Sequence, residues 1–291
     1  MKVVILAAGY ANRLRSETQD GLIPKTLLPI TINGKRASIL SFIYDKIREI
    51  KDNVDGVIVV VNDKYEKSIK QETAKYFGEH KNEVNFGVRI ISDESKDASE
   101  AKGANYAMRL AANAIPSSYK GEIMVMASDN YFDFSLNDLV AEYDRLSEKK
   151  PVNMVVSKVY PDEEREFIAK NFGILNIGKN NKIIGLDEKP GIENLKSNNV
   201  SLALYMFNNR DFKRINEYMD MMSDDPKKRD SLGYFINYLT KNTHTYTYPI
   251  DTFFCDIGTP EEYRKMRDEG HYTDSAIGIL SRIVNNPKEF D

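Results

Sequence analysis

Residues 3–9 of the chain read VVILAAG, and residues 24–30 read PKTLLPI. The run Val3–Leu6 consists of β-branched and aliphatic residues, the pattern of a strand buried on both faces. The residues that follow, up to Gly9, are small enough to let backbone N–H groups approach a ligand closely. Arg13 and Lys25 then add positive charge to the loop. A cationic loop at the carboxyl end of a first strand is suited to holding a polyphosphate.

The segments after this loop predict the fold class. Strand-like and helix-like patterns alternate through the first half, which indicates a mostly parallel sheet with helices on both faces. Short strands with tight links follow, and Lys179-Asn180-Asn181 is a hairpin turn. The expected strands are 56–61, 88–92, 122–127, 152–160, 172–177, 182–186, 199–207 and 245–249. The expected helices are 38–51, with Ser38 as its cap, and 64–77, 100–114, 211–222, 231–239, 260–269 and 274–284.

Composition narrows the function classes. A net charge of -3 over 291 residues does not favour nucleic-acid binding. No apolar run approaches the length of a membrane span, and Met1-Lys2 enters a strand directly, so we expect neither a membrane anchor nor a signal peptide. The single cysteine, Cys255, fits a reducing cytoplasm. Three scattered histidines form no zinc pattern, so any metal is expected to be hard and oxygen-ligated.

The segment from Ile5 to Ile30 resembles the signature loop of the sugar-1-phosphate nucleotidylyltransferases. In that loop a strand ending in LAAG precedes Arg-Leu and later Pro-Lys-x-Leu-Leu-Pro. The family couples a nucleoside triphosphate to a sugar 1-phosphate and releases pyrophosphate. Two departures stand out: Ala11 replaces the usual second glycine, and the segment between Thr18 and Pro24 is longer than usual. The resemblance extends over most of the chain, and the chain length is similar to that of the glucose-1-phosphate thymidylyltransferase branch.

The resemblance implies a Rossmann-like α/β fold with an inserted sugar-binding β subdomain and C-terminal helices. No Gly/Ser-rich linker separates the halves, so we expect one domain. Its nucleotide-binding half would be 1–150, its sugar-phosphate half 151–260 and its C-terminal helices 261–291. Arg13, Lys25 and Lys189 would be catalytic. The implied nucleotide contacts are Leu6, Ala7, Ala8, Gly9, Arg13, Lys25, Gly103 and Ser128.

Two aspartates resemble the magnesium ligands of the family. Asp129 directly follows the expected strand 122–127, at the sheet edge where α/β folds bind ligands. Asp256 ends an apolar run and precedes Ile257-Gly258-Thr259-Pro260. Two hard carboxylates on one Mg²⁺ would leave coordination positions for phosphate oxygens and water. Cys255 beside them is expected to be a packing residue rather than a nucleophile.

The sugar 1-phosphate site is implied by a second group of residues. Glu188-Lys189-Pro190 ends one strand of the expected hairpin, and Phe172-Gly173 begins the other. In the family the Glu binds sugar hydroxyls, the Lys holds the sugar phosphate and the Gly allows close approach of the ring. Asn199 would line the sugar on a further strand, where Ala203 stands in place of a frequent glycine.

Several alternatives remain open at this level. dTTP or UTP with glucose 1-phosphate is favoured, but Ser92 to Gly103 lacks the glutamine that usually faces the pyrimidine. A cytidylyltransferase acting on another small phosphate is therefore a second reading, and a catalytically weak regulatory subunit is a third. A nicotinamide site is disfavoured because Gly9 is the only glycine of G-x-G-x-x-G present. We expect a homo-oligomer with no nucleic-acid or membrane partner.

Overall fold

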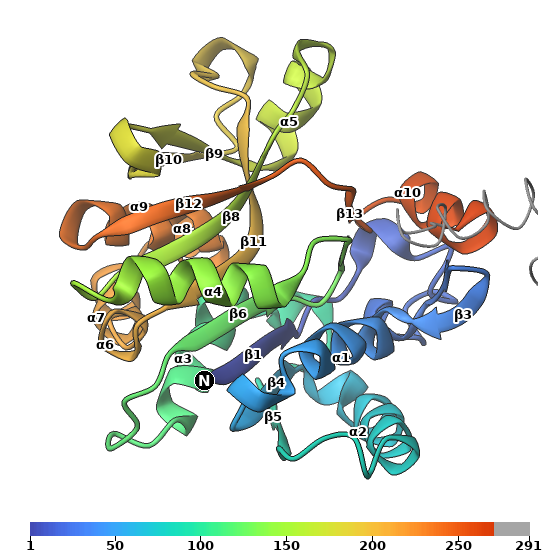
Figure 1. Cartoon of the computed structure of the whole chain (residues 1–291). Coiled ribbons are helices and arrows are strands. Elements are labelled where there is room, and N and C mark those ends of the chain that lie inside the picture. Colours follow the sequence, from blue (N-terminus) through green and yellow to red (C-terminus); the bar gives the residue numbers. More distant parts are fainter. Residues whose placement is uncertain (271–291) are drawn as a thin grey trace, which may run out of the picture.

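One mixed β-sheet organises the computed structural model, which describes residues 1–270 (Figure 1). Its strands are β1 (Lys2–Ala7), β4 (Gly56–Val61), β5 (Val88–Ser92), β6 (Ile123–Ala127), β8 (Asn153–Val159), β9 (Gly173–Ile177), β10 (Ile183–Glu188), β11 (Asn199–Phe207) and β12 (Thr245–Ile250). Within these residues the nine strands follow the order β10-β9-β11-β6-β1-β4-β5, and β8 pairs with β11 and β12. Strands β6, β1, β4 and β5 are parallel, and β11 runs antiparallel to β6.

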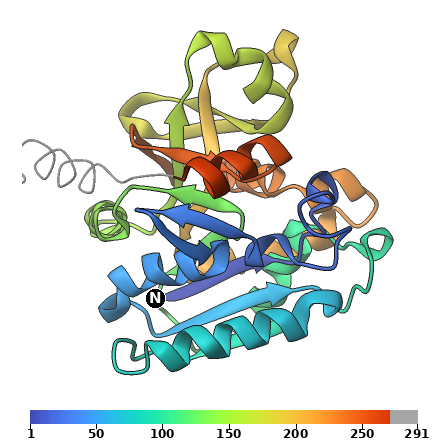
Figure 2. The same ribbon diagram turned by 90° about the vertical axis from the view of Figure 1, so that its right-hand side faces the viewer.

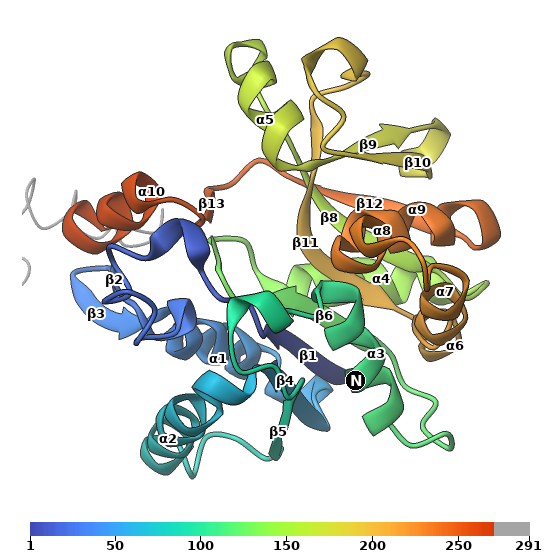
Figure 3. The ribbon, with the colours of Figure 1, turned by 180° about the vertical axis from the view of Figure 1, so that it is seen from behind.

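Helices cover both faces of this sheet, as the alternating pattern predicts. Along β1, Val3 and Ile5 belong to one hydrophobic core and Val4 to the other, because successive side chains of a strand point to opposite faces. The first core packs against α1, α2 and α4, and the second against α3, α7 and α9 (Figures 1 and 3). These helices are α1 (Ile39–Glu49), α2 (Asp63–Glu79), α3 (Ala104–Ala114), α4 (Leu136–Ser147), α7 (Ile215–Met221) and α9 (Leu232–Asn242).

The second half of the chain extends the same sheet instead of forming a separate one. Strand β11 pairs with β6 on one side and with β8 on the other. Helix α5 (Arg165–Asn171) and the β9–β10 hairpin stand above this body of the molecule (Figure 2). Smaller elements complete the fold: β2 (Pro29–Ile32), β3 (Lys35–Ser38), β7 (Asn130–Phe132), β13 (Phe254–Asp256), α6 (Asn209–Phe212), α8 (Pro226–Asp230) and α10 (Pro260–Arg264).

Most predicted elements are confirmed, and the differences have local causes. Ser38 caps α1 as expected, its side chain accepting a hydrogen bond from the Ser41 backbone N–H. The helix expected from residue 100 begins at Ala104, because Gly103 at φ 86° interrupts the helical path. The helix expected over 211–222 is split into α6 and α7, and buried Asp211, within α6, accepts hydrogen bonds from the side-chain amides of Asn153 in β8 and of Asn208, the cap of α6. The expected helix 274–284 lies outside the described residues.

Helices α4 and α5 are not among the predicted elements. In the part of the chain that the structure describes, no helix is long and apolar enough to cross a membrane.

Replacing Ile5 with Ala tests the role of the central strand. Ile5 is fully buried in the first core, so the variant should lose about 2–5 kcal/mol of the free energy of unfolding. Urea denaturation followed by circular dichroism measures this loss. Ile184→Ala is the control, because Ile184 is a strand residue that is 62% exposed, and it should cost about 1 kcal/mol or less. Equal losses in the two variants would contradict the assignment of β1 as the core of the fold.

Candidate active site

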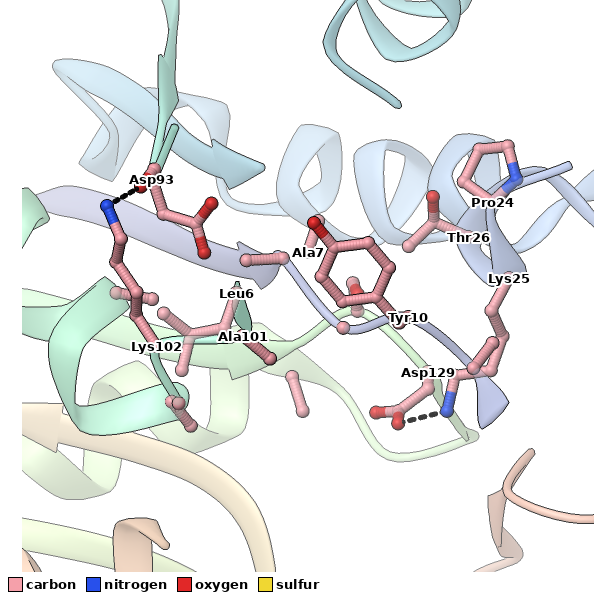
Figure 4. A pocket seen from close by; sticks show the side chains of 18 of the residues that line it. Leu6, Ala7, Tyr10, Pro24, Lys25, Thr26, Asp93, Ala101, Lys102 and Asp129 are labelled. Carbon is pink, nitrogen blue, oxygen red and sulfur yellow. Dashed lines mark hydrogen bonds and ion pairs between the residues drawn. The ribbon is translucent and has the colours of Figure 1, made fainter. Parts of the chain in front are cut away.

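A cavity of about 350 Å³ opens at the carboxyl ends of the parallel strands. Strands β1, β5 and β6 all end at its wall, which is the edge where parallel sheets bind ligands. Figure 4 shows Lys25 and Asp129 at one end, Asp93 and Lys102 at the other, and Tyr10 between them. Seven of the predicted nucleotide contacts line this cavity, namely Leu6, Ala7, Ala8, Gly9, Lys25, Gly103 and Ser128.

The loop after β1 is held in place from the neighbouring strand. Buried Asn62, just beyond β4, donates a hydrogen bond of 3.1 Å from its side-chain amide to the Ala8 carbonyl. Ala11 adopts the left-handed conformation, with φ 51° and ψ 39°, at the start of a short 3₁₀ turn. The replacement of glycine by alanine therefore leaves the turn in a conformation that glycine favours, at the cost of backbone strain.

Positive charge gathers beside the predicted metal ligands. The Lys25 ammonium lies 2.5 Å from a carboxylate oxygen of Asp129. Arg13 does not line the cavity surface itself, but its guanidinium borders Gly258, where an added Cβ would lie 3.1 Å from it. The pKa of Asp256 is raised overall by burial and by Asp129, and the positive charges of Lys25 and Arg13 partly offset that rise. The two cations thus face the same pair of carboxylates from the loop after β1.

The two aspartates are brought together by a short antiparallel pairing. Strand β13 pairs with β7, which sets Asp256 opposite Asn130, and the Ile257 N–H donates to the Asp129 carbonyl at 2.9 Å. Burial and the neighbouring Asp129 carboxylate raise the pKa of Asp256 well above its usual range. Within residues 1–270 no group of three or more His, Cys, Asp and Glu gathers around one point. The pair supplies hard oxygen donors that fit Mg²⁺, with the remaining ligands left to substrate and water.

A second cavity, of about 290 Å³, adjoins the first at Asp129. Its lining includes Asp256 and three predicted sugar-phosphate residues, Gly173, Glu188 and Lys189. The Glu188 carboxylate sits between two glycines: a Cβ on Gly173 would lie 3.0 Å from its Oε2 atom, and one on Gly233 only 1.9 Å. Both glycines therefore provide the space that Glu188 occupies.

Other residues fall outside the pattern expected from the sequence. Asn199, predicted to contact the sugar, does not line the second cavity; its backbone N–H donates a hydrogen bond to the Ser197 hydroxyl. Ala203 does line it, at a register shift of β11 and with φ 51°. Burial raises the pKa of the Cys255 thiol to about 12, in keeping with a packing role.

Sequence reasoning missed two contributors, Asp93 and Asp230. Asp93 follows β5 just as Asp129 follows β6, and this strand-end position was the available signal. Asp230 borders both cavities from the last position of α8, a segment far along the chain that no local pattern connects to the sheet.

Comparisons with known proteins agree with this geometry. A sequence model of the nucleotidyl transferase family matches residues 2–271. The chain is 28% identical over 260 residues to the bifunctional protein GlmU of Methanococcus aeolicus, and 24% identical over 296 residues to a UTP–glucose-1-phosphate uridylyltransferase of Synechocystis. The alignments cover 89% and 98% of this chain, but 52% and 65% of the two relatives. The chain thus spans about half the length of GlmU.

The same fold occurs in a solved structure titled as a putative glucose-1-phosphate thymidylyltransferase from Bacillus anthracis in complex with a sucrose. The TM-score is 0.68 at 21% sequence identity, over 93% of this chain and 95% of the other. This likeness confirms the predicted Rossmann-like arrangement of a mostly parallel sheet flanked by helices.

Replacing an alanine with glycine usually destabilises a folded protein, but the left-handed conformation of Ala11 predicts the opposite or no effect at this position. Ala11→Gly should leave the free energy of unfolding unchanged or raise it by up to about 1 kcal/mol, because glycine adopts this conformation without the steric cost. Ala74→Gly, at an exposed position inside α2, should lower it by about 1 kcal/mol. Chemical denaturation of both variants makes the comparison. A similar loss in both would show that Ala11 is not strained.

Proposed function

The chain belongs to the nucleotidyl transferase family, and we propose that it couples a nucleoside triphosphate to a sugar 1-phosphate and releases pyrophosphate. One observation carries this proposal: two cavities of substrate size meet at Asp129, with Asp256 beside it and cations on the side of the first cavity. The first would hold the nucleotide and the second the sugar 1-phosphate. Glucose 1-phosphate is the favoured acceptor, because the uridylyltransferase relative and the thymidylyltransferase-like structure both carry glucose 1-phosphate in their names.

The proposed reaction is a single in-line displacement. A phosphate oxygen of the sugar 1-phosphate, oriented by Lys189, attacks the α-phosphorus of the nucleotide. The bond from the α-phosphorus to the bridging oxygen breaks, and pyrophosphate leaves toward Lys25 and Arg13. The attacking phosphate is already ionised at neutral pH, so no general base is required. Alignment and charge neutralisation then account for catalysis.

Asp129 and Asp256 would hold Mg²⁺ between the two substrates. When bound, this ion supplies positive charge that screens the approach of one phosphate to another. The Lys25 ammonium holds the Asp129 carboxylate at the junction of the cavities through their ion pair, and Arg13 lies near Asp256 from the same loop. The joint presence of these groups argues against a purely regulatory subunit, which has no need of two metal carboxylates.

The choice of base is the finer part of the proposal. The resemblance to thymidylyl and uridylyl enzymes favours dTTP or UTP. The alternative, a cytidylyltransferase, is supported by the charged segment Ser92 to Gly103, where the usual glutamine is missing. Four residues of that segment line the first cavity, and two of them, Asp93 and Lys102, carry ionisable side chains.

Lys25→Ala and Asp129→Ala test the catalytic assignment. Each variant should release pyrophosphate at least about 100-fold more slowly, because each removes charge that the transition state requires. Both should stay folded, since the Asp129 side chain is 28% exposed and is not stranded in the core. The assay combines Mg²⁺, each nucleoside triphosphate and a panel of sugar 1-phosphates, and measures pyrophosphate.

Lys70→Ala is the matched control for this test, because Lys70 forms a comparable ion pair with Glu66 at 2.6 Å on the exposed side of α2. Its turnover should equal that of the unmodified protein. Unchanged pyrophosphate release in both Lys25→Ala and Asp129→Ala would remove the assignment.

Gly233→Ala tests the sugar side separately. The added methyl would overlap Glu188, whose carboxylate must then move, so the KM for the sugar 1-phosphate should rise at least about tenfold, equivalent to about 1.4 kcal/mol. The KM for the nucleotide should stay constant. Gly78→Ala is the control, because a Cβ at Gly78 in α2 would have no neighbour within 4 Å. If both KM values rose together, Glu188 would not be specific to the sugar.

A further inference from the structure

A buried carboxylate lies at the end of the first cavity that is remote from Lys25. Asp93 directly follows β5, is 3% exposed and lines the cavity (Figure 4). Its Oδ1 atom accepts two hydrogen bonds from Ser95, one from the backbone N–H at 2.9 Å and one from the hydroxyl at 2.6 Å. Within residues 1–270 its Oδ2 atom has no hydrogen-bond partner. One oxygen of a nearly buried carboxylate is thus left for a ligand.

The surroundings of Asp93 fix its orientation. The Tyr10 hydroxyl donates to the Ser95 hydroxyl at 2.9 Å, which in turn donates to Asp93. Burial raises the pKa of Tyr10, so its hydroxyl stays protonated and available as the first donor of this chain. The Lys102 ammonium donates to the Asp93 backbone carbonyl. Tyr10 lies in the loop after β1, and Lys102 lies just before α3. Together with Ser95, they leave the Asp93 carboxylate little freedom to turn away from the cavity.

The sheet sets how far Asp93 lies from the reacting phosphate. Asp93 follows β5 and Asp129 follows β6, and β1 and β4 lie between these strands. Three strand spacings separate them, about 14 Å in total. With the phosphates at Lys25 and Asp129, the part of a nucleotide that reaches the far end of the cavity is its base.

We propose that Asp93 reads the nucleobase and selects a base that carries an exocyclic amino group over uracil and thymine; this inference rests on the proposed function. An ionised carboxylate oxygen only accepts hydrogen bonds. The amino group of cytosine, adenine or guanine can donate to it. Uracil and thymine present carbonyl oxygens at the corresponding positions, and two facing acceptors repel and leave the carboxylate oxygen unpaired.

This selection differs from the preference for dTTP or UTP that the resemblance implies. It agrees with the cytidylyltransferase alternative, and it has a direct test because CTP and UTP are nearly identical in size and differ at the 4-position. Binding of each triphosphate to the whole chain, with Mg²⁺ and without sugar 1-phosphate, is measured by titration calorimetry. CTP should bind roughly ten- to a hundredfold more tightly than UTP, the worth of one hydrogen bond to a charged group.

Further arms of the titration identify the amino-bearing base. ATP and GTP are compared with ITP, which has a carbonyl in place of the amino group of adenine and lacks the 2-amino group of guanine. The base for which the amino group matters most is the one that the cavity accepts. Equal affinity for the two members of every pair, with and without the amino group, or tighter binding of UTP or dTTP, would overturn the proposal.

Asp93→Asn should invert the preference within the pyrimidine pair. Both Ser95 groups are donors, so the amide oxygen must take the Oδ1 position and the NH₂ group must face the cavity. This group donates to the O4 carbonyl of uracil and repels the cytosine amino group. The variant should therefore bind UTP at least as tightly as CTP. If it failed to fold, the CTP and UTP affinities of the unmodified protein would still decide.

Asp97→Asn is a closely matched control. Asp97 bonds the Ser99 backbone N–H at 2.8 Å and its hydroxyl at 2.5 Å, the same arrangement as Asp93 with Ser95, but it is exposed and outside the cavity. Its CTP to UTP ratio should equal that of the unmodified protein. A ratio unchanged in Asp93→Asn as well would overturn the base assignment.

The titration also separates this inference from the proposed function. A clear base preference without pyrophosphate release for any sugar 1-phosphate would contradict the proposed reaction and leave the role of Asp93 standing. Failure of every triphosphate to bind would contradict both.

Discussion

The site depends on the short pairing of β7 with β13, which holds two aspartates from distant parts of the chain at one junction. Placing two carboxylates close together in a largely buried site is unfavourable. Burial and the neighbouring Asp129 charge both disfavour the ionised form of Asp256, and its pKa is therefore raised. For an acid whose pKa is higher in the folded than in the unfolded state, stability decreases as pH rises through that interval. Lys25 and Arg13 partly offset this repulsion. A bound cation would offset it further, so the pairing that destabilises the fold is the same one that would hold the metal in the proposed reaction.

Much of the fold could be predicted because its signals are local. Runs such as Val3–Leu6 and Gly56–Val61 are apolar without alternation, as strands buried on both faces must be, and the β9–β10 turn follows from consecutive asparagines. The ends of helices are harder to predict from the sequence than the positions of strands. Gly103 delays the start of α3, and buried Asp211, shortly before the break between α6 and α7, accepts a hydrogen bond from Asn153 on the distant strand β8.

The candidate site could be predicted in part, for the same reason. Lys25 and Asp129, which were predicted from short sequence motifs, lie together at the first cavity. Asn199 was predicted in the same way, but it lines neither cavity. Asp93 has no motif at all. Its significance comes from burial and from the two Ser95 donors that occupy one of its oxygens, and these are properties of the folded chain.

The pairing of β11 with β6 has a consequence for how the two substrates are aligned. The first cavity, proposed for the nucleotide, lies at the parallel strands, and the second, proposed for the sugar 1-phosphate, lies at β9, β10 and β11, yet all these strands belong to one hydrogen-bonded sheet. The register of the backbone hydrogen bonds between β11 and β6 therefore fixes the distance between the two cavities. A slip of β11 by a single residue would shift a sugar 1-phosphate bound in the second cavity by about 3.3 Å. That shift is as large as the distance between two reacting atoms that are aligned for reaction. Side chains that line either cavity can therefore be replaced without changing the distance between the cavities, whereas a change in the β11–β6 pairing would change it.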